Sequence, residues 1–89
     1  MQQLSSPEAL DYVVKQLKAA GFLPLPHKSE GGLIIVPFSP AGGKDYSIGA
    51  VSYSEARIRR ESREESIKML KSKLMEAKTA AVREPGARR

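Results

Sequence analysis

Apolar residues near the start of the chain recur at the spacing of one helix face, at Leu10, Val13, Val14 and Leu17. Ser6 suits the N-cap, Pro7 suits the first helical position, and Gly21 is a typical stop after the last turn. The pattern predicts a helix over residues 7–20.

The middle of the chain changes to short segments that are apolar or alternating. "LIIVPF" (33–38) is β-branched and bounded by turn residues, so it predicts a strand, and its uniform apolarity predicts burial on both faces. "DYSIGAVSY" (45–53) alternates and predicts a half-buried strand, paired with the first in an antiparallel hairpin. The two prolines of "FLPLP" (22–26) predict an edge segment, and "HKSEGG" (27–32) reads as a loop.

The last apolar stripe predicts a second, longer helix, through Ile67, Leu70, Leu74, Ala77 and Ala81. Ser52 and Ser62 each have a glutamate three residues on, the spacing of a capping box. A start at Ser62 is favoured, which gives a helix over 63–82 and leaves 56–60 as a short third strand. A start at Ser52 would instead give one continuous helix from residue 53. The breakers Pro85 and Gly86 predict a flexible basic tail, 83–89.

These elements predict an α+β fold in the order α-β-β-β-α. We expect a small antiparallel sheet of two to three strands, with the N-terminal helix and the longer C-terminal helix packed on one face. A chain of 89 residues forms one domain, which we place at 1–82.

The element order resembles that of double-stranded-RNA-binding domains and of small HicA-type ribonuclease toxins. "VVKQLKAAGF" (13–22) is similar to the start of the toxins, where a helix ends in Gly-Phe before the first strand. The chain departs from both families further on. "HKSEGG" lacks the Gly-Ser-His-type catalytic turn of the toxins, and "YSEARIRR" (53–60) lacks the Lys-Lys-x-Ala-Lys-type cluster of the RNA-binding domains. The resemblance implies a nucleic-acid-binding fold by analogy.

Composition argues against several kinds of chemistry. The chain has no cysteine and one histidine, so we expect no thiol chemistry, no metal site and no cofactor. His27, with Glu30 or Lys28 as a second group, is the one candidate for acid–base catalysis, and a ribonuclease is our third hypothesis. We assign no catalytic residue. The longest apolar run, "LIIV", is far too short for a membrane span, and no signal peptide is visible, so we expect a cytoplasmic protein.

Charge directs the functional prediction toward polyanions, because the net charge is +5 and the pI is about 9.8. If residues 56–60 form a strand, Arg57 and Arg59 share one sheet face and form a patch with Lys44, with Tyr46 or Tyr53 nearby, a platform suited to single-stranded nucleic acid. We predict a non-catalytic module that binds RNA or DNA, mainly through backbone phosphates. The predicted nucleic-acid-binding residues are Lys44, Arg57, Arg59, Arg60, Arg88 and Arg89.

The alternative prediction is a protein–protein interaction module or a small homo-oligomeric regulatory protein. A homodimer would form through a sheet edge or through the C-terminal helix. The stretch "SEARIRRESREES" (54–66) carries four arginines and four glutamates, so it is neutral as a whole. Its meaning therefore depends on whether 56–60 is strand or helix.

Overall fold

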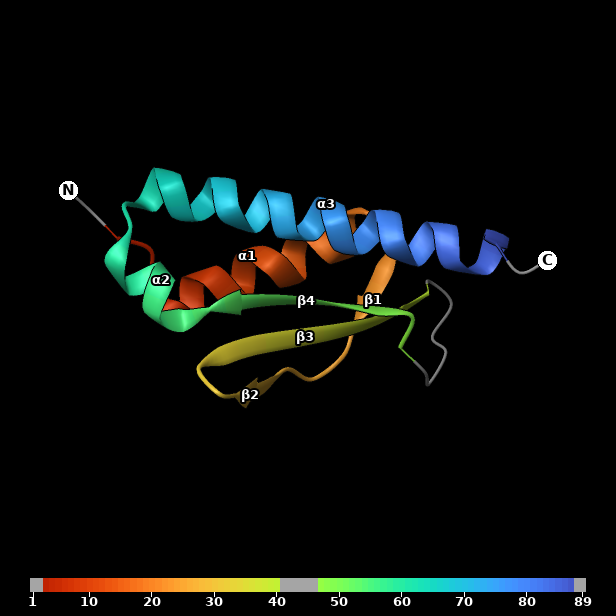
Figure 1. Cartoon of the computed structure of the whole chain (residues 1–89), viewed down its shortest axis with the longest axis horizontal. Coiled ribbons are helices and arrows are strands. Elements are labelled where there is room, and N and C mark those ends of the chain that lie inside the picture. Colours follow the sequence, from red (N-terminus) through yellow and green to blue (C-terminus); the bar gives the residue numbers. More distant parts are fainter. Residues whose placement is uncertain (1–2, 41–46, 88–89) are drawn as a thin grey trace.

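The structure, a computed structural model, describes residues 3–40 and 47–87, with side chains as far as residue 81. Two helices lie on one side of an antiparallel sheet, and the longer helix runs along the whole length of the molecule (Figure 1). The elements are α1 (Ser6–Ala19), β1 (Phe22–Pro24), β2 (Lys28–Glu30), β3 (Leu33–Pro40), β4 (Gly49–Ser54), α2 (Glu55–Arg60) and α3 (Arg63–Ala87). The predicted α+β fold and its order are confirmed, and the sheet has four strands.

The long strand β3 is the centre of the sheet and pairs antiparallel with every other strand. β4 lies along one side of β3 over six residue pairs, with Ile34 opposite Tyr53. β1 and β2 share the other side, where Leu23 lies opposite Ser39 and Ser29 lies opposite Ile34. In the described part of the chain, β4 is therefore an edge strand over its whole length.

The two faces of β3 differ. Ile34, Val36 and Phe38 face the helices and are buried, whereas the alternate residues Leu33, Ile35 and Pro37 lie on the opposite face, where Leu33 is 41% exposed. The prediction that this strand is buried on both faces is wrong, because both long helices of the described chain lie on the same side of the sheet (Figure 1). The second face remains open and partly apolar.

The helices divide the buried face of the sheet between them. α1 packs on β1 and β3, whereas α3 packs on β4. Phe38 links the two sides: its ring centroid lies 4.8 Å from that of Phe22, and Gly49 leaves the space in which the ring sits. The apolar core consists of Leu4, Ala9, Val13, Leu17, Ile34, Val36, Phe38, Val51, Tyr53, Ile58, Met69, Leu70, Leu74 and Ala81.

The segment "HKSEGG" is not a loop, because Lys28–Glu30 forms β2 and turns directly into β3. Gly31 and Gly32 have φ values of 57° and 81°, and a two-residue hairpin turn with both φ values positive is the type I′ turn. The pair of glycines therefore supplies a tight turn, which the polar composition of the segment concealed.

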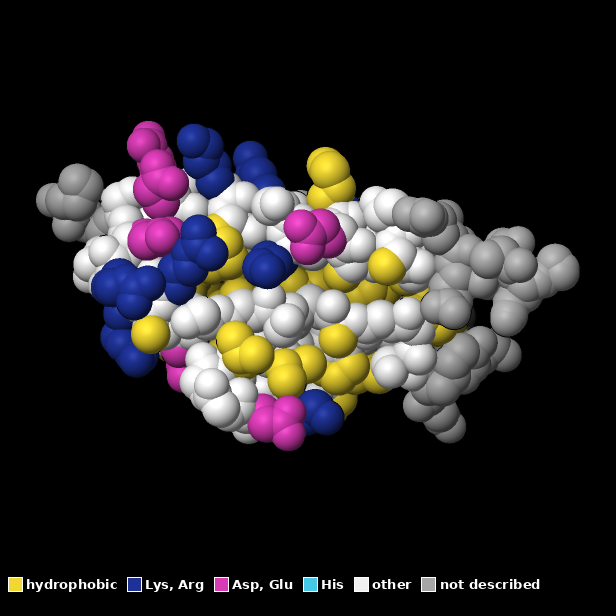
Figure 2. All heavy atoms as spheres, in the orientation of Figure 1, with side chains coloured by type: hydrophobic (Ala, Val, Ile, Leu, Met, Phe, Trp, Pro, Cys, Tyr) yellow, Lys and Arg dark blue, Asp and Glu magenta, His cyan; other side chains and the backbone are white. Residues whose placement is uncertain are grey.

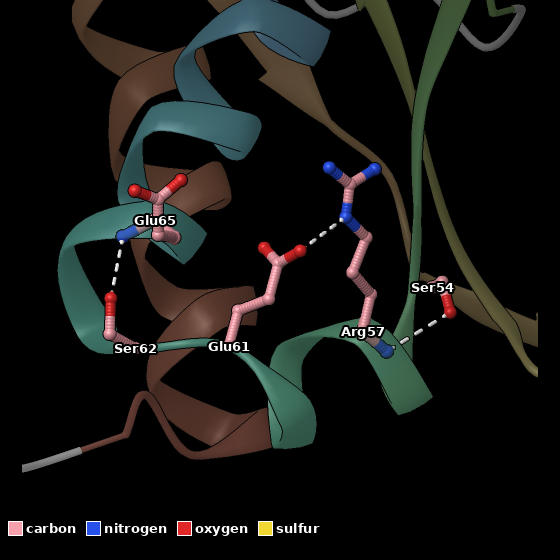
Figure 3. A network of polar contacts seen from close by, with 5 residues as sticks. All are labelled: Ser54, Arg57, Glu61, Ser62 and Glu65. Carbon is pink, nitrogen blue, oxygen red and sulfur yellow. Dashed lines mark hydrogen bonds and ion pairs between the residues drawn. The ribbon is translucent and has the colours of Figure 1, made fainter.

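Residues 55–60 form a helix, so the predicted strand at 56–60 is wrong, and a continuous helix from residue 53 is wrong as well. The Ser54 hydroxyl accepts the Arg57 N–H at 3.2 Å and caps α2, and the Ser62 hydroxyl accepts the Glu65 N–H at 3.2 Å at the start of α3 (Figure 3). Glu61 is extended between the two helices. The predicted start near Ser62 is confirmed.

Two smaller predictions also need correction. Ser5, not Ser6, caps α1, because Ser5 and Glu8 form a reciprocal capping box. α3 continues to Ala87, past Pro85, whose missing N–H removes one bond within the last turn.

Candidate nucleic-acid interface and the edge of β4

The predicted basic residues that the structure describes, Arg57, Arg59 and Arg60, all lie exposed on the short helix α2. Lys44, Arg88 and Arg89 lie outside the described residues. Because 56–60 is helical, Arg57 and Arg59 do not share a sheet face, and the predicted basic strand does not form.

The N-terminal segment and α1 hold α2 in place. The Gln3 side-chain amide donates to the Arg59 carbonyl oxygen at 2.7 Å, and the Ser6 hydroxyl donates to the Glu55 carboxylate at 2.7 Å. The buried side chain of Ile58 anchors the same helix in the core. The arginines of α2 therefore project from a backbone that is fixed by contacts on both sides.

Arg57 is the most constrained of the three arginines. Its Nε lies 3.0 Å from a carboxylate oxygen of Glu61, four residues on, and 48% of its side chain is exposed (Figure 3). An exposed pair of this kind contributes about 0–1 kcal/mol, so another anion could displace Glu61 at little expense. Figure 3 shows the Arg57 side chain extending from α2 into the space between α3 and β4.

α3 adds lysines at the same end of the molecule, which the sequence prediction did not assign to a site. Lys68 and Lys71 are exposed, and Lys73 is half-buried. Figure 2 shows dark blue side chains gathered over α2 and the N-terminal half of α3, with magenta acidic side chains among them. The break at Glu61 produces this grouping, because it folds α2 back against α3.

A groove of about 340 Å³, here called the α2–α3 groove, lies between these helices. It contains three basic side chains and two acidic ones, so its own charge is slightly positive. Its lining residues are Arg57, Glu65, Lys68, Met69, Ser72, Lys73 and Glu76.

Tyr53 is not available for stacking on a base, so this part of the predicted platform is wrong. Its side chain is 1% exposed, because position 53 faces the helices. Burial raises the pKa of the phenol to about 12, and the charge of Glu55 adds to the rise. Its hydroxyl has no hydrogen-bond partner among the described residues. Tyr46, the other predicted aromatic, lies outside them.

Glu8 links α1 to the start of α3. The Arg63 guanidinium lies 3.4 Å from the Glu8 carboxylate. Hydrogen bonds from the backbone and hydroxyl of Ser5 lower the Glu8 pKa, and the Arg63 charge acts in the same direction. Both side chains of this pair are about half exposed, so the pair is weak and leaves Arg63 accessible to an anion.

His27 lies in a different region, at an apolar cleft of about 440 Å³ between α1 and the segment after β1. Its side chain is exposed, and Lys28 and Glu30 follow it on β2. The cleft is lined by Leu10, Val14, Lys18, Leu23, Pro24, Leu25, Pro26, His27 and Val36. Within the described part of the chain, no group of three or more His, Asp and Glu side chains is placed to hold a metal ion.

The outer edge of β4 exposes unpaired backbone groups. The Glu55 N–H donates to the Gly32 carbonyl oxygen, and the register then makes Val51 and Tyr53 the residues that bond to β3. Ala50 and Ser52 therefore direct their N–H and C=O groups away from the sheet. In Figure 2 a band of white atoms, the colour of backbone and serine, runs along β4 between the yellow of β3 and the side chains of α3.

Comparison of the chain with protein-family models, curated proteins and solved structures finds no match. Among the described residues, no helix combines the length and apolar character needed to cross a membrane. The functional argument therefore depends on the two surfaces above: the basic side chains of α2 and α3, and the edge of β4.

Proposed function

We propose that the protein is a small, non-catalytic module that binds the phosphate backbone of RNA or DNA. The observation that supports this most strongly is the gathering of Lys and Arg side chains over α2 and the N-terminal half of α3 (Figure 2). The exposed basic residues of these two segments include Arg59 and Arg60 on α2 and Lys68 and Lys71 on α3. These four exposed residues are called the basic surface below. Arg57 and Lys73 lie at its border, in the α2–α3 groove.

Phosphate contacts by lysine and arginine release condensed counterions, so the affinity should fall steeply as salt is raised. Such contacts carry no direct sequence information. The buried position of Tyr53 removes one means of stacking on bases, so we expect weak sequence preference. Lys44, Arg88 and Arg89 remain part of this proposal as additional phosphate ligands.

The test is a salt titration of binding to single- and double-stranded RNA and DNA. The double substitution Arg59→Glu/Arg60→Glu should weaken binding at least about tenfold at low salt. It should also reduce the salt slope by about 1.4 to 1.8, since each lost contact contributes about 0.7 to 0.9. The matched control is Lys15→Glu/Lys18→Glu, which changes the net charge equally but lies at the other end of α1.

A chain ending at residue 82 separates the basic surface from the terminal arginines. If binding is retained in the shortened chain and lost in the α2 variant, the basic surface is the binding site. Affinity that does not change with salt, or equal losses in the α2 variant and the α1 control, would contradict the proposal.

A second candidate function, a protein-interaction module, is favoured by a separate observation. Among the described residues, the outward N–H and C=O groups of β4 have no strand partner. Such an edge is a template for pairing with another chain, either a second copy or a segment of a different protein.

A further inference from the structure

We propose that the free edge of β4 binds an extended segment of another protein as an added strand, and that this segment alternates acidic and apolar side chains. The inference rests on the second candidate function and is independent of nucleic-acid binding. It follows from the backbone edge, from what lies on each side of it, and from the position of α3.

β4, with the sequence "GAVSYS", carries neither charged residues nor proline, two of the features that natural proteins use to prevent strand addition at a sheet edge. Six residues are long enough for several backbone hydrogen bonds, and Ala50 and Ser52 present the groups that would make them.

The open face beside this edge suits apolar side chains. Ala50, Ser52 and Ser54 are small, and they lie opposite Pro37, Ile35 and Leu33 of β3.

A large apolar side chain on the added strand could cover these small residues and reach the apolar side chains of β3. Cross-strand and diagonal neighbours lie within contact distance in an antiparallel pair. Figure 2 shows the yellow apolar surface of the sheet directly below the white band of β4.

The helix side of the same edge suits acidic side chains. Alternate residues of an added strand would point toward the helices. The α2–α3 groove there contains Arg57, Lys68 and Lys73 together with Glu65 and Glu76, so it is slightly positive. Figure 3 shows Arg57 beside β4, paired only with Glu61 in a partly exposed contact. A carboxylate on the added strand could take the place of Glu61. The partner segment is therefore expected to alternate acidic and apolar side chains, because the helix side and the open face beside the β4 edge differ.

The position of α3 argues for a lone strand and against a second copy of the chain. Paired strands lie about 4.8 Å apart, whereas packed helices need about 8 to 10 Å between their axes. α3 packs on β4 itself, whereas α1 packs on β1 and β3. Two copies joined edge to edge at β4 would bring their α3 helices closer than helices can pack, but a strand without a helix meets no such obstacle.

The probe for the test is a blocked ten-residue peptide of alternating Val and Glu, added to the full chain and followed by amide hydrogen exchange. Exchange at Ala50 and Ser52 should slow at least tenfold, while Val51 and Tyr53, already bonded to β3, should change little. The same peptide with every second amide N-methylated on its bonding edge should have no effect, because it cannot donate to β4. A peptide with Lys in place of Glu should bind at least tenfold more weakly.

Two substitutions examine the protein side. Ser52→Pro removes an outward N–H without breaking a bond to β3, and it should reduce peptide affinity at least tenfold. Lys73→Glu should weaken binding of the Glu peptide several-fold, whereas Lys78→Glu, on the same helix but outside the groove, should not.

The inference is overturned if the peptide leaves exchange at Ala50 and Ser52 unchanged, or if the N-methylated peptide binds equally well. It is also overturned if these amides are protected without peptide in a species of twice the mass, since the occupant is then a second copy. The peptide comparisons keep the test valid even if the Ser52→Pro variant does not fold.

Discussion

The two edges of the sheet differ in how far they resist further strand pairing. One edge is formed by β1 and β2, which are three residues each and carry Pro24, Lys28 and Glu30. The other edge is β4, a regular strand of six uncharged residues. Proteins ordinarily block the edges of their sheets, so the open edge is the one where a partner is expected.

The edge formed by β1 and β2 is interrupted between these two strands, and the interruption has a local cause in the sequence. The Leu25 N–H donates to the Pro37 carbonyl oxygen, but Pro37 has no N–H to return the bond. The pairing then shifts by one residue between β1 and β2, since Pro24 lies opposite Phe38 but Lys28 lies opposite Ile35. The missing N–H of Pro37 is on this side, and β3 keeps one register with β4 over six residue pairs.

The largest effect that we predict concerns Tyr53 on β4. It tests whether this strand, although its edge is open, is firmly packed against the helices. The Tyr53 phenol has a pKa of about 12 in the folded chain against 10 in the unfolded chain. Its contribution to stability is complete below pH 10 and is lost as the pH rises to about 12, because only the unfolded state ionises in that range. The free energy of unfolding should fall by about 2 to 3 kcal/mol across this window.

Chemical denaturation from pH 9 to pH 12 measures this loss, with Tyr53→Phe as the comparison. The variant should lack this component, and at neutral pH it should be as stable as the parent or more stable, since its removed hydroxyl has no partner among the described residues. A variant with the same alkaline loss as the parent would show that Tyr53 is not buried.

The next effect concerns the glycine at the start of β4. A Cβ at Gly49 would lie 2.8 Å from the Phe38 ring, so Gly49→Ala should destabilise the protein by about 1 to 3 kcal/mol through overpacking. Ala50→Ser, one residue along on the open face, should change stability by less than about 0.5 kcal/mol. Urea denaturation of both variants gives the comparison, and equal effects would mean that the two faces of β4 do not differ.

The smallest effect that we predict tests the edge formed by β1 and β2. Lys28→Val/Glu30→Val removes both charges from β2 and should change stability little, because both residues are exposed. The variant should nevertheless self-associate at high concentration, which sedimentation velocity would detect as a rise in mass. A variant that stays monomeric would indicate that the register shift and the prolines alone protect this edge.

Much of the fold could be predicted from the sequence because its signals are local and strong. The helix stripe at residues 10–17, the β-branched run at 33–38 and the cap at Ser62 each point to the element that forms. β2 could not be predicted, because "KSE" has no apolar residue and is defined only by its pairing with β3 and the turn at Gly31–Gly32. The sequence also could not predict that only one face of β3 is buried, because this depends on where both helices pack.

The candidate site was harder to predict because it depends on which residues of α2 and α3 point toward the core and which point outward. A single helix through residue 58 would place Ile58 away from the apolar stripe, which favoured a strand at 56–60. The extended residue Glu61 resets the phase, so Ile58 is buried while Arg59 and Arg60 are exposed. The hydroxyl of Ser54, which caps α2, was the signal that would have indicated this helix.

Amide exchange along β4 in the free protein tests most directly whether this edge is open. Ala50 and Ser52 should exchange about 100-fold faster than Val51 and Tyr53, because only the latter pair bonds to β3. Similar protection at all four amides would contradict the account, since it would mean that another part of the chain or a second copy already covers the edge.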